Sequence, residues 1–163
     1  MKKMFYKISI VFINLILLSF YLEGAPQVIG TIDIKPPYPT LNYPSDICLN
    51  PITHRMYVTS FNSNKIVIID TNTNKPVGEI TNIPYPNEMV IDQSVNRGYV
   101  LSYRQIYVLD LNNNLVMQTI SITSITASKL LLFSDINKLY VIGTRYDNNY
   151  VMKILTIDTL YNT

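Results

Sequence analysis

The stretch "MYVTSFNSNKIVIIDTNTNKPVGEI", Met56 to Ile80, decides the fold of this chain. It holds two short apolar runs, a group of polar residues after each, and the beginning of a third run. Val, Ile, Thr and Tyr dominate the runs, which favours β-strands, and the Asn and Ser between them favour turns. The pattern returns twice further along the chain, so this stretch is one copy of a repeating unit.

Two kinds of residue mark the repeat. A tyrosine followed by valine recurs at spacings of 42 and 41 residues, at Tyr57, Tyr99 and Tyr140. Each tyrosine is followed by an apolar run that closes on an aspartate: Asp70, Asp110 and Asp158. Anchors that recur at matched offsets indicate a repeat architecture rather than a single set of hairpins.

Each unit is expected to form one blade of a β-propeller. The units cover residues 45–82, 87–122 and 127–158, and the last contains only three of the four runs. The third run of a unit is apolar nearly throughout, as expected for a strand buried on both faces. Four antiparallel strands in about 40 residues are typical of a propeller blade. The predicted fold is therefore all-β, a partial β-propeller of about three blades that follows an N-terminal hydrophobic helix.

The first unit also resembles the YVTN β-propeller repeat family. The residues that carry the resemblance are Tyr57-Val58-Thr59-Ser60, then Val67-Ile68-Ile69-Asp70, then Thr71-Asn72-Thr73-Asn74. Ser60 departs from the family pattern, which has Asn there, and the second and third units keep only Tyr-Val and the strand that ends in Asp. The resemblance covers roughly residues 28–163. It implies a propeller fold and a periplasmic or cell-surface location, but no activity.

Residues 1–24 are expected to lie outside the propeller, which would occupy residues 25–163. Lys2, Lys3 and Lys7 precede an apolar run, Ile8 to Leu22, of 15 residues. That run is shorter than the roughly 20 residues of a membrane span, so a secretory signal peptide is predicted, with a retained N-terminal anchor as the alternative. We therefore expect a secreted, periplasmic or cell-surface protein that meets a membrane only through this segment.

The number of strands does not close a ring. Residues 27–34, "QVIGTIDI", resemble the fourth strand of a unit and are suited to complete the last blade. Even so, three blades are fewer than the roughly four to eight that propellers use. Either the chain is a truncated piece of a longer propeller, which its stop in the middle of a turn favours, or two copies form a homodimer with a six-bladed ring.

The charge of the chain argues against nucleic-acid binding. The sequence has 13 Lys and Arg and 11 Asp and Glu, and residues 1–24 contain three of the former and one of the latter. The remainder therefore carries ten basic and ten acidic side chains and no net charge. No basic stripe is left that would attract a phosphate backbone.

Few residues are candidates for chemistry. Cys48, the only cysteine, lies in an apolar run and is expected to be a buried small hydrophobe rather than a reactive thiol. His54, the only histidine, is expected in a surface turn, and one His with one Cys cannot form a structural zinc site. The five glycines are not grouped, so no phosphate-binding loop is present, and the Pro-rich residues 35–44 are interpreted as a linker.

The recurring aspartates and tyrosines admit a functional and a structural interpretation. Calcium loops pack several carboxylates into about 12 residues, whereas Asp70, Asp110 and Asp158 occur once per unit and precede Thr, Leu or Asn-rich turns. We expect them to hold Asx turns. The tyrosines at 57, 99 and 140 could form an aromatic platform, but identical blade positions favour packing between neighbouring blades.

The sequence predicts no catalytic, cofactor-binding or metal-binding residue and no cofactor. The favoured function is a non-enzymatic, exported binding or scaffold module whose partner is an unidentified protein, peptide or glycan. The alternative is a fragment of a propeller enzyme, lactonase-like or quinoprotein-like, whose catalytic blades are absent. Fold alone does not decide between these functions.

Overall fold

A computed structural model describes residues 28, 30–32, 34, 41–145 and 151–160. The chain divides into two units, residues 1–32 and 33–163. In the first unit the described residues, 28 and 30–32, have no helix or strand assignment. The predicted signal segment 1–24 and most of the predicted strand 27–34 lie outside the described residues, so both stay predictions.

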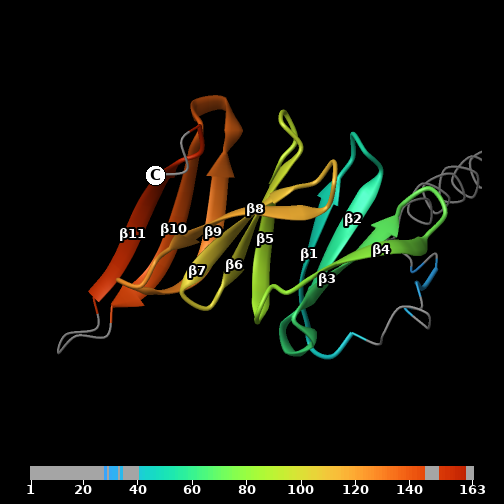
Figure 1. The fold of residues 1–163 in the computed structure, drawn as a ribbon, viewed down its shortest axis with the longest axis horizontal. Coiled ribbons are helices and arrows are strands. Elements are labelled where there is room, and N and C mark those ends of the chain that lie inside the picture. The colour runs from blue at the N-terminus through green and yellow to red at the C-terminus, as the bar shows by residue number, and fades with distance from the viewer. Residues whose placement is uncertain (1–27, 29, 33, 35–40, 146–150, 161–163) are drawn as a thin grey trace, which may run out of the picture. The chain divides into compact units, whose positions relative to one another are not determined.

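The second unit is all-β, as predicted (Figure 1). Its described residues form three antiparallel sheets, in the orders β1-β2-β3-β4, β5-β6-β7-β8 and β11-β10-β9. We call these the first, second and third sheet. The strands are β1 (Pro44–Asn50), β2 (Arg55–Ser60), β3 (Lys65–Asp70), β4 (Lys75–Thr81), β5 (Pro86–Asp92), β6 (Arg97–Ser102), β7 (Gln105–Asp110), β8 (Leu115–Ser121), β9 (Thr126–Phe133), β10 (Lys138–Arg145) and β11 (Val151–Asp158). Each sheet is one repeat unit of the sequence, which is the arrangement of a partial β-propeller.

The local sequence explains the meander of each sheet. Short turns join consecutive strands, and most contain a residue with positive φ, a conformation that Asn tolerates better than other non-glycine residues. Asn64, Asn74, Asn96, Asn114 and Asn137 occupy such positions. Two of the turns include a short 3₁₀ helix, η1 (Phe61–Ser63) and η2 (Ser134–Ile136). The chain therefore reverses direction at low conformational cost.

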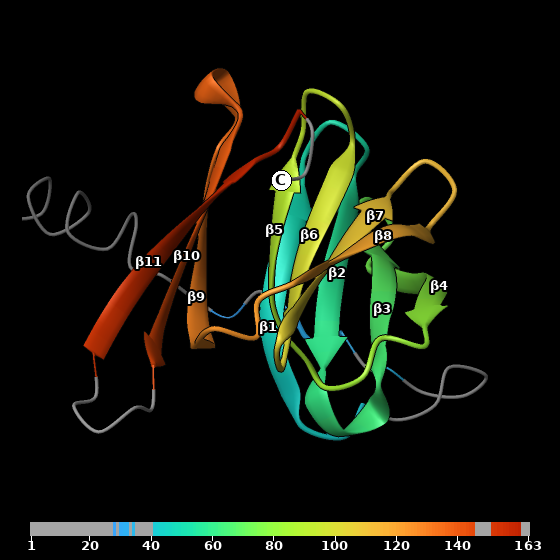
Figure 2. The ribbon, with the colours of Figure 1, turned by 60° about the vertical axis from the view of Figure 1, so that its left-hand side comes forward.

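The sheets pack face to face through two apolar cores. The core between the first and second sheets includes Tyr57, Ile66 and Ile68 on one side and Met89, Val100 and Leu109 on the other. The core between the second and third sheets repeats this plan with Tyr99, Leu101, Ile106 and Val108 against Leu130, Leu139 and Val141. Strand β5 lies beside β1 and beside β9, so the first strands of the three sheets are neighbours (Figure 2).

The prediction that the third strand of each unit is buried on both faces holds for β3 but not for β11. Ile66 to Ile69 are all buried in β3, whereas β11 has exposed residues at Val151, Met152 and Ile154. The reason is that the second sheet packs over Ile66 and Ile68 of β3, whereas no described sheet covers the face of the third sheet on which Ile154 lies, and β11 is also an edge strand of that sheet. None of the helices among the described residues is long and apolar enough to cross a membrane.

Candidate functional site

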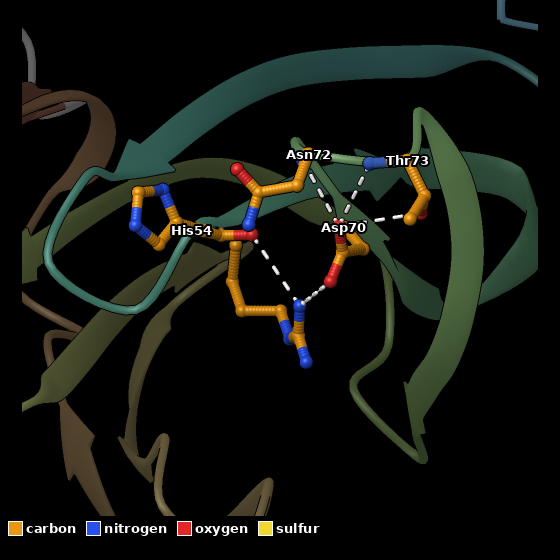
Figure 3. A network of polar contacts seen from close by, with 5 residues as sticks. His54, Asp70, Asn72 and Thr73 are labelled. Atoms are coloured by element: carbon orange, nitrogen blue, oxygen red, sulfur yellow. Dashed lines mark hydrogen bonds and ion pairs between the residues drawn. The ribbon is translucent and has the colours of Figure 1, made fainter.

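The recurring aspartates hold turns, as predicted, and Figure 3 shows the first of them. One oxygen of Asp70, Oδ1, accepts hydrogen bonds from the backbone N–H groups of Asn72 (2.9 Å) and Thr73 (3.0 Å). The other, Oδ2, forms an ion pair with Arg55, which lies directly opposite Asp70 in the β2–β3 register. The Thr73 N–H and then the Arg55 guanidinium hold the pKa of the Asp70 carboxyl below its usual value.

The other two aspartates also accept a hydrogen bond from the backbone N–H two residues further along the chain. Asp110 accepts from the backbone N–H of Asn112 at 2.9 Å, and this bond is the main reason why its pKa is lowered. Asp158 accepts from the backbone N–H of Leu160 at 3.0 Å and forms an ion pair of 2.7 Å with Lys138. The Asx turns are thus confirmed at all three positions. Among the described residues, no group of three or more His, Cys, Asp and Glu side chains is placed to hold a metal ion.

His54 is an exposed turn residue, as predicted. Its φ is 52°, and its carbonyl oxygen accepts a hydrogen bond of 3.1 Å from the Thr71 N–H. Asn96 and Asn137 make the same backbone contact in the second and third sheets, at 3.1 and 2.9 Å. His54 therefore stands at a position where the repeat requires a left-handed backbone, and its structural contribution comes from the main chain.

Cys48 is half-buried on β1 rather than fully buried. Burial, and after it the charge of Asp46, raises the pKa of its thiol to about 11. At neutral pH the side chain is the protonated thiol, which is a poor nucleophile. This low reactivity agrees with the prediction that Cys48 is not a reactive thiol. Its burial is less complete than predicted, because part of the side chain is exposed to solvent.

Two of the three repeat tyrosines pack between blades. Tyr57 and Tyr99 are 1% and 0% exposed, and each belongs to one of the two cores. Tyr140 differs: it is only half-buried and contacts Phe133 edge-on, with ring centroids 5.7 Å apart. The reason is its place on the face of the third sheet that no described sheet covers.

That uncovered face forms an apolar groove of about 370 Å³. We call it the open face, and its lining residues are Leu131, Phe133, Ile136, Tyr140, Ile142 and Ile154. Ile154 is 60% exposed, although its counterpart Ile106 in the second sheet is fully buried. The open face therefore has the apolar composition of a blade interface, and no blade formed by the described residues covers it.

The sequence patterns did not reveal the carboxylates that connect neighbouring blades. Asp46 on β1 accepts a hydrogen bond of 2.9 Å from the Met89 N–H of β5. Glu88 on β5 accepts one of 2.8 Å from the Leu130 N–H of β9, and also pairs with Lys129 at 3.0 Å. Asp46, Glu88 and Lys129 follow one another at spacings of 42 and 41 residues, the same offsets as the repeat tyrosines. That spacing is the signal that would have found them.

A row of four aromatic rings, three exposed and one half-buried, was also missed. We call it the loop row: Tyr43, Phe61, Tyr85 and Tyr103. The ring centroids of Tyr43 and Phe61 are 6.4 Å apart, and those of Phe61 and Tyr85 are 5.2 Å apart. Tyr43 and Tyr85 precede the first strands of their sheets, and Phe61 and Tyr103 follow the second strands, so all four lie at the same end of the blades. The 42-residue offset again relates them in pairs.

The loop row continues into two grooves. The first, of about 320 Å³, is lined by Tyr85, Tyr103, Arg104, Tyr107 and four neighbouring residues. The second, of about 460 Å³, shares Arg104 and Thr123 with it and adds Ser124, Thr126, Thr144 and Arg145. The guanidinium carbon of Arg104 lies 5.6 Å from the centre of the Tyr103 ring. Aromatic surface thus passes directly into a surface of hydroxyl and guanidinium groups.

Comparison with known proteins shows the fold and nothing finer. No protein-family model and no curated protein matches the chain. Three solved structures resemble it: hydrazine synthase of Kuenenia stuttgartiensis (17% identity, 71% of this chain and 34% of that one, TM-score 0.64), a protein of unknown function from Bacteroides caccae (13%, 64% and 42%, 0.51), and the Cps50 (Swd1) β-propeller domain of Myceliophteria thermophila (7%, 71% and 39%, 0.53). The chain spans well under half the length of each. At these identities the likeness shows a shared β-propeller fold, of which the described residues form two four-stranded blades and a third with three strands.

Proposed function

We propose that this chain is a non-enzymatic, exported module of a larger β-propeller, related to the YVTN repeat proteins, and that it acts by binding. The open face is the observation that carries the proposal. Each of the two described interfaces buries one face of a sheet against the next sheet. The open face presents apolar side chains on the corresponding face of the third sheet, with Ile154 at the repeat position where Ile66 and Ile106 are fully buried. Its natural occupant is therefore a further propeller blade.

The free energy available on this face supports the proposal. Leu131, Phe133, Ile136 and Ile154 are 51%, 47%, 56% and 60% exposed. Burying a large apolar side chain fully contributes about 1.5–3 kcal/mol, so covering half of each of these four yields several kcal/mol. Apolar patches of this kind mark interaction sites in soluble proteins. A blade that docks here would bury apolar side chains, as the sheets β5–β8 and β9–β11 do at the two described interfaces.

The test is the solution mass of the full chain and of an Ile154→Glu variant, measured by light scattering. Ile154 is exposed and outside both cores, so the charge disrupts only docking on the open face. A dimer that Ile154→Glu dissociates supports completion of the ring by a second copy. If the chain is a monomer at about 100 μM and becomes more stable when adjacent coding sequence is added, the result supports a longer chain. If neither the Ile154→Glu substitution nor the added sequence changes the mass or the stability, the result contradicts the proposal. Val95→Glu, in an exposed turn of the second sheet, is the matched control.

Adjacent sequence would also test the enzyme alternative. A lactonase-like or quinoprotein-like propeller needs acidic residues or histidines that converge at the channel-facing strand starts. Blades that lack such residues favour the binding module. Export rests on the pattern of residues 1–24, and fusion of that segment to a reporter enzyme that is active only outside the cytoplasm tests it.

A further inference from the structure

The backbone of the loop row is the unusual feature from which this inference begins. Ten non-glycine residues among those described have positive φ: six are Asn, one is His54, and three are tyrosines. The tyrosines are Tyr43 (64°), Tyr85 (48°) and Tyr103 (49°), and all three belong to the loop row. The left-handed region is unfavourable for a bulky residue, and such strain gathers at functional sites.

Packing does not account for these tyrosines. Tyr43 and Tyr103 are each 68% exposed and Tyr85 is 49% exposed, whereas the packing tyrosines Tyr57 and Tyr99 are buried. At the other described turns with a positive φ the chain uses Asn, or His54 in one turn, and Asn adopts the left-handed conformation more readily than Tyr. The loop row therefore combines a strained backbone with rings that are presented to solvent.

Neighbouring contacts fix where these rings lie. The Tyr85 N–H donates to Oδ1 of Asn64 at 2.9 Å, and the Phe61 N–H donates to the Tyr43 carbonyl oxygen at 2.9 Å. The hydroxyl of Ser102 donates to the Pro84 carbonyl oxygen, which ties the turn of Tyr103 to the segment before β5. These bonds hold the backbone from which the rings project, so less of the loop has to be ordered when a ligand binds.

The polar groups beside the loop row indicate the class of ligand. The second groove is lined by four hydroxyl-bearing side chains and two arginines, and none of the described residues that line either groove is acidic. A guanidinium binds a carboxylate through two parallel hydrogen bonds, and hydroxyls exchange hydrogen bonds with other hydroxyls. Sugar rings present flat C–H faces that pack on aromatic rings and carry many hydroxyls around their edges.

From these observations we infer that the loop row and its two grooves form a binding site for an acidic glycan, with Tyr85 and Tyr103 contacting sugar rings and Arg104 contacting a carboxylate. The inference rests on the proposed function as a binding module but concerns a surface at the loop end of the blades, separate from the open face. A proline-rich peptide would also fit the aromatic groove, but it has no need of the adjoining groove with its hydroxyls and arginines.

The full chain tests this inference by calorimetry with hexamers of polygalacturonate, with neutral cellohexaose as the uncharged comparison. Tyr85→Asn and Tyr103→Asn keep a residue that suits positive φ and remove the ring. We expect each to weaken polygalacturonate binding at least tenfold while leaving the melting temperature equal or higher. Arg104→Gln should weaken binding of the acidic hexamer and not that of the neutral one. Lys75→Gln, at the opposite end of the blades, is the charge control.

Several results would overturn the inference. These are no binding of the acidic hexamer at millimolar concentration, binding that the two tyrosine substitutions leave unchanged, and tighter binding of a proline-rich peptide or of single-stranded oligothymidine than of the hexamer. The solution mass of the tyrosine variants separates this failure from failure of the proposed function. Unchanged assembly through the open face with no glycan binding refutes the glycan site alone.

Discussion

Gly143 offers a sharp test of how the third sheet is built. It lies on β10, where the register with β9 shifts between Ile142 and Gly143. A Cβ atom added there would lie 2.5 Å from the Thr126 carbonyl oxygen and 2.8 Å from the Ala127 Cα. Both atoms belong to the backbone of β9, so neither can rotate away. Gly143 is therefore required by the close approach of two strands at a β-bulge.

Two other glycines provide a graded comparison. At Gly98 the nearest atoms to an added Cβ would be the ends of flexible side chains, Cε of Met89 at 2.8 Å and Cδ2 of Leu111 at 3.2 Å. At Gly78 the nearest atom would be Cδ1 of Ile68 at 3.6 Å, an ordinary van der Waals contact. None of the three has a positive φ. The substitutions to Ala therefore differ in the space available rather than in backbone conformation.

The free energies of unfolding should follow that order. Replacing Gly by Ala stabilises by roughly 0.4–1 kcal/mol where the residue fits, because the unfolded chain loses freedom, so Gly78→Ala should gain about that much. Overpacking costs about 1–3 kcal/mol or more, and methionine relieves it easily. We expect Gly98→Ala to change stability by no more than about 1 kcal/mol and Gly143→Ala to lose about 3 kcal/mol.

Urea denaturation followed by far-ultraviolet circular dichroism measures the series, since the chain has no tryptophan. At roughly 2–4 °C per kcal/mol for a chain of this size, Gly143→Ala should lower the melting temperature by about 10 °C. Hydrogen exchange on β9 and β10 shows whether the loss is confined to the third sheet. A Gly143→Ala variant as stable as Gly78→Ala would refute the reasoning, because the backbone contact that forbids a side chain would then not exist.

Three further predictions concern single contacts. Cys48 should react with iodoacetamide about five hundredfold more slowly at pH 8 than at pH 11, because its pKa of about 11 leaves roughly one thiol in a thousand ionised at pH 8 and about half ionised at pH 11; a rate that levels off near pH 9 would contradict this. Because the pKa of Asp70 is lowered on folding, its carboxylate stabilises the fold above the usual Asp pKa of about 4, and this contribution is lost as the pH falls through the lower folded pKa. Asp70→Asn should therefore make the free energy of unfolding less dependent on pH below about 4, as acid titration of urea midpoints would show. Glu88→Ala removes the acceptor of the Leu130 N–H and should cost about 1–2 kcal/mol, measured by urea denaturation with the exposed Glu79→Ala as control.

The sequence predicted the blades because their signals are local. Strand propensity, polar turns and the closing aspartates act within a few residues of one another, so the Asx turns at Asp70 and Asp110 needed no knowledge of the tertiary structure. The burial of Tyr57 and Tyr99 could also be expected, since a repeat places equivalent residues in equivalent interfaces. Tyr140 is an exception, because no described sheet covers the face of the third sheet on which it lies. The sequence pattern within one unit does not show whether another blade packs against that unit.

The loop row escaped prediction for a different physical reason. Tyr43 and Phe61 are 18 residues apart in the chain, and Phe61 and Tyr85 are 24 apart, so no local periodicity connects them. Their proximity depends on two blades packing side by side and on backbone conformations that tyrosine seldom adopts. The 42-residue offset was visible, but it alone could not separate exposed rings from buried ones. Only the strained φ values and the exposure distinguish Tyr85 from Tyr57.

Whether a given repeat position is buried therefore depends on whether a following sheet covers it. Ile66 and Ile106 are fully buried because a following sheet covers them, and Ile154 at the equivalent position is 60% exposed. Since its local sequence is as apolar as theirs, nothing within β11 compensates for that exposure. The third sheet is held on one face by the core with Tyr99 and Leu139, and on its other face it retains unburied surface of the kind that the first two sheets bury. The stability of each blade in this repeat consequently depends on contacts with its neighbouring blades. At the open face no described blade supplies those contacts.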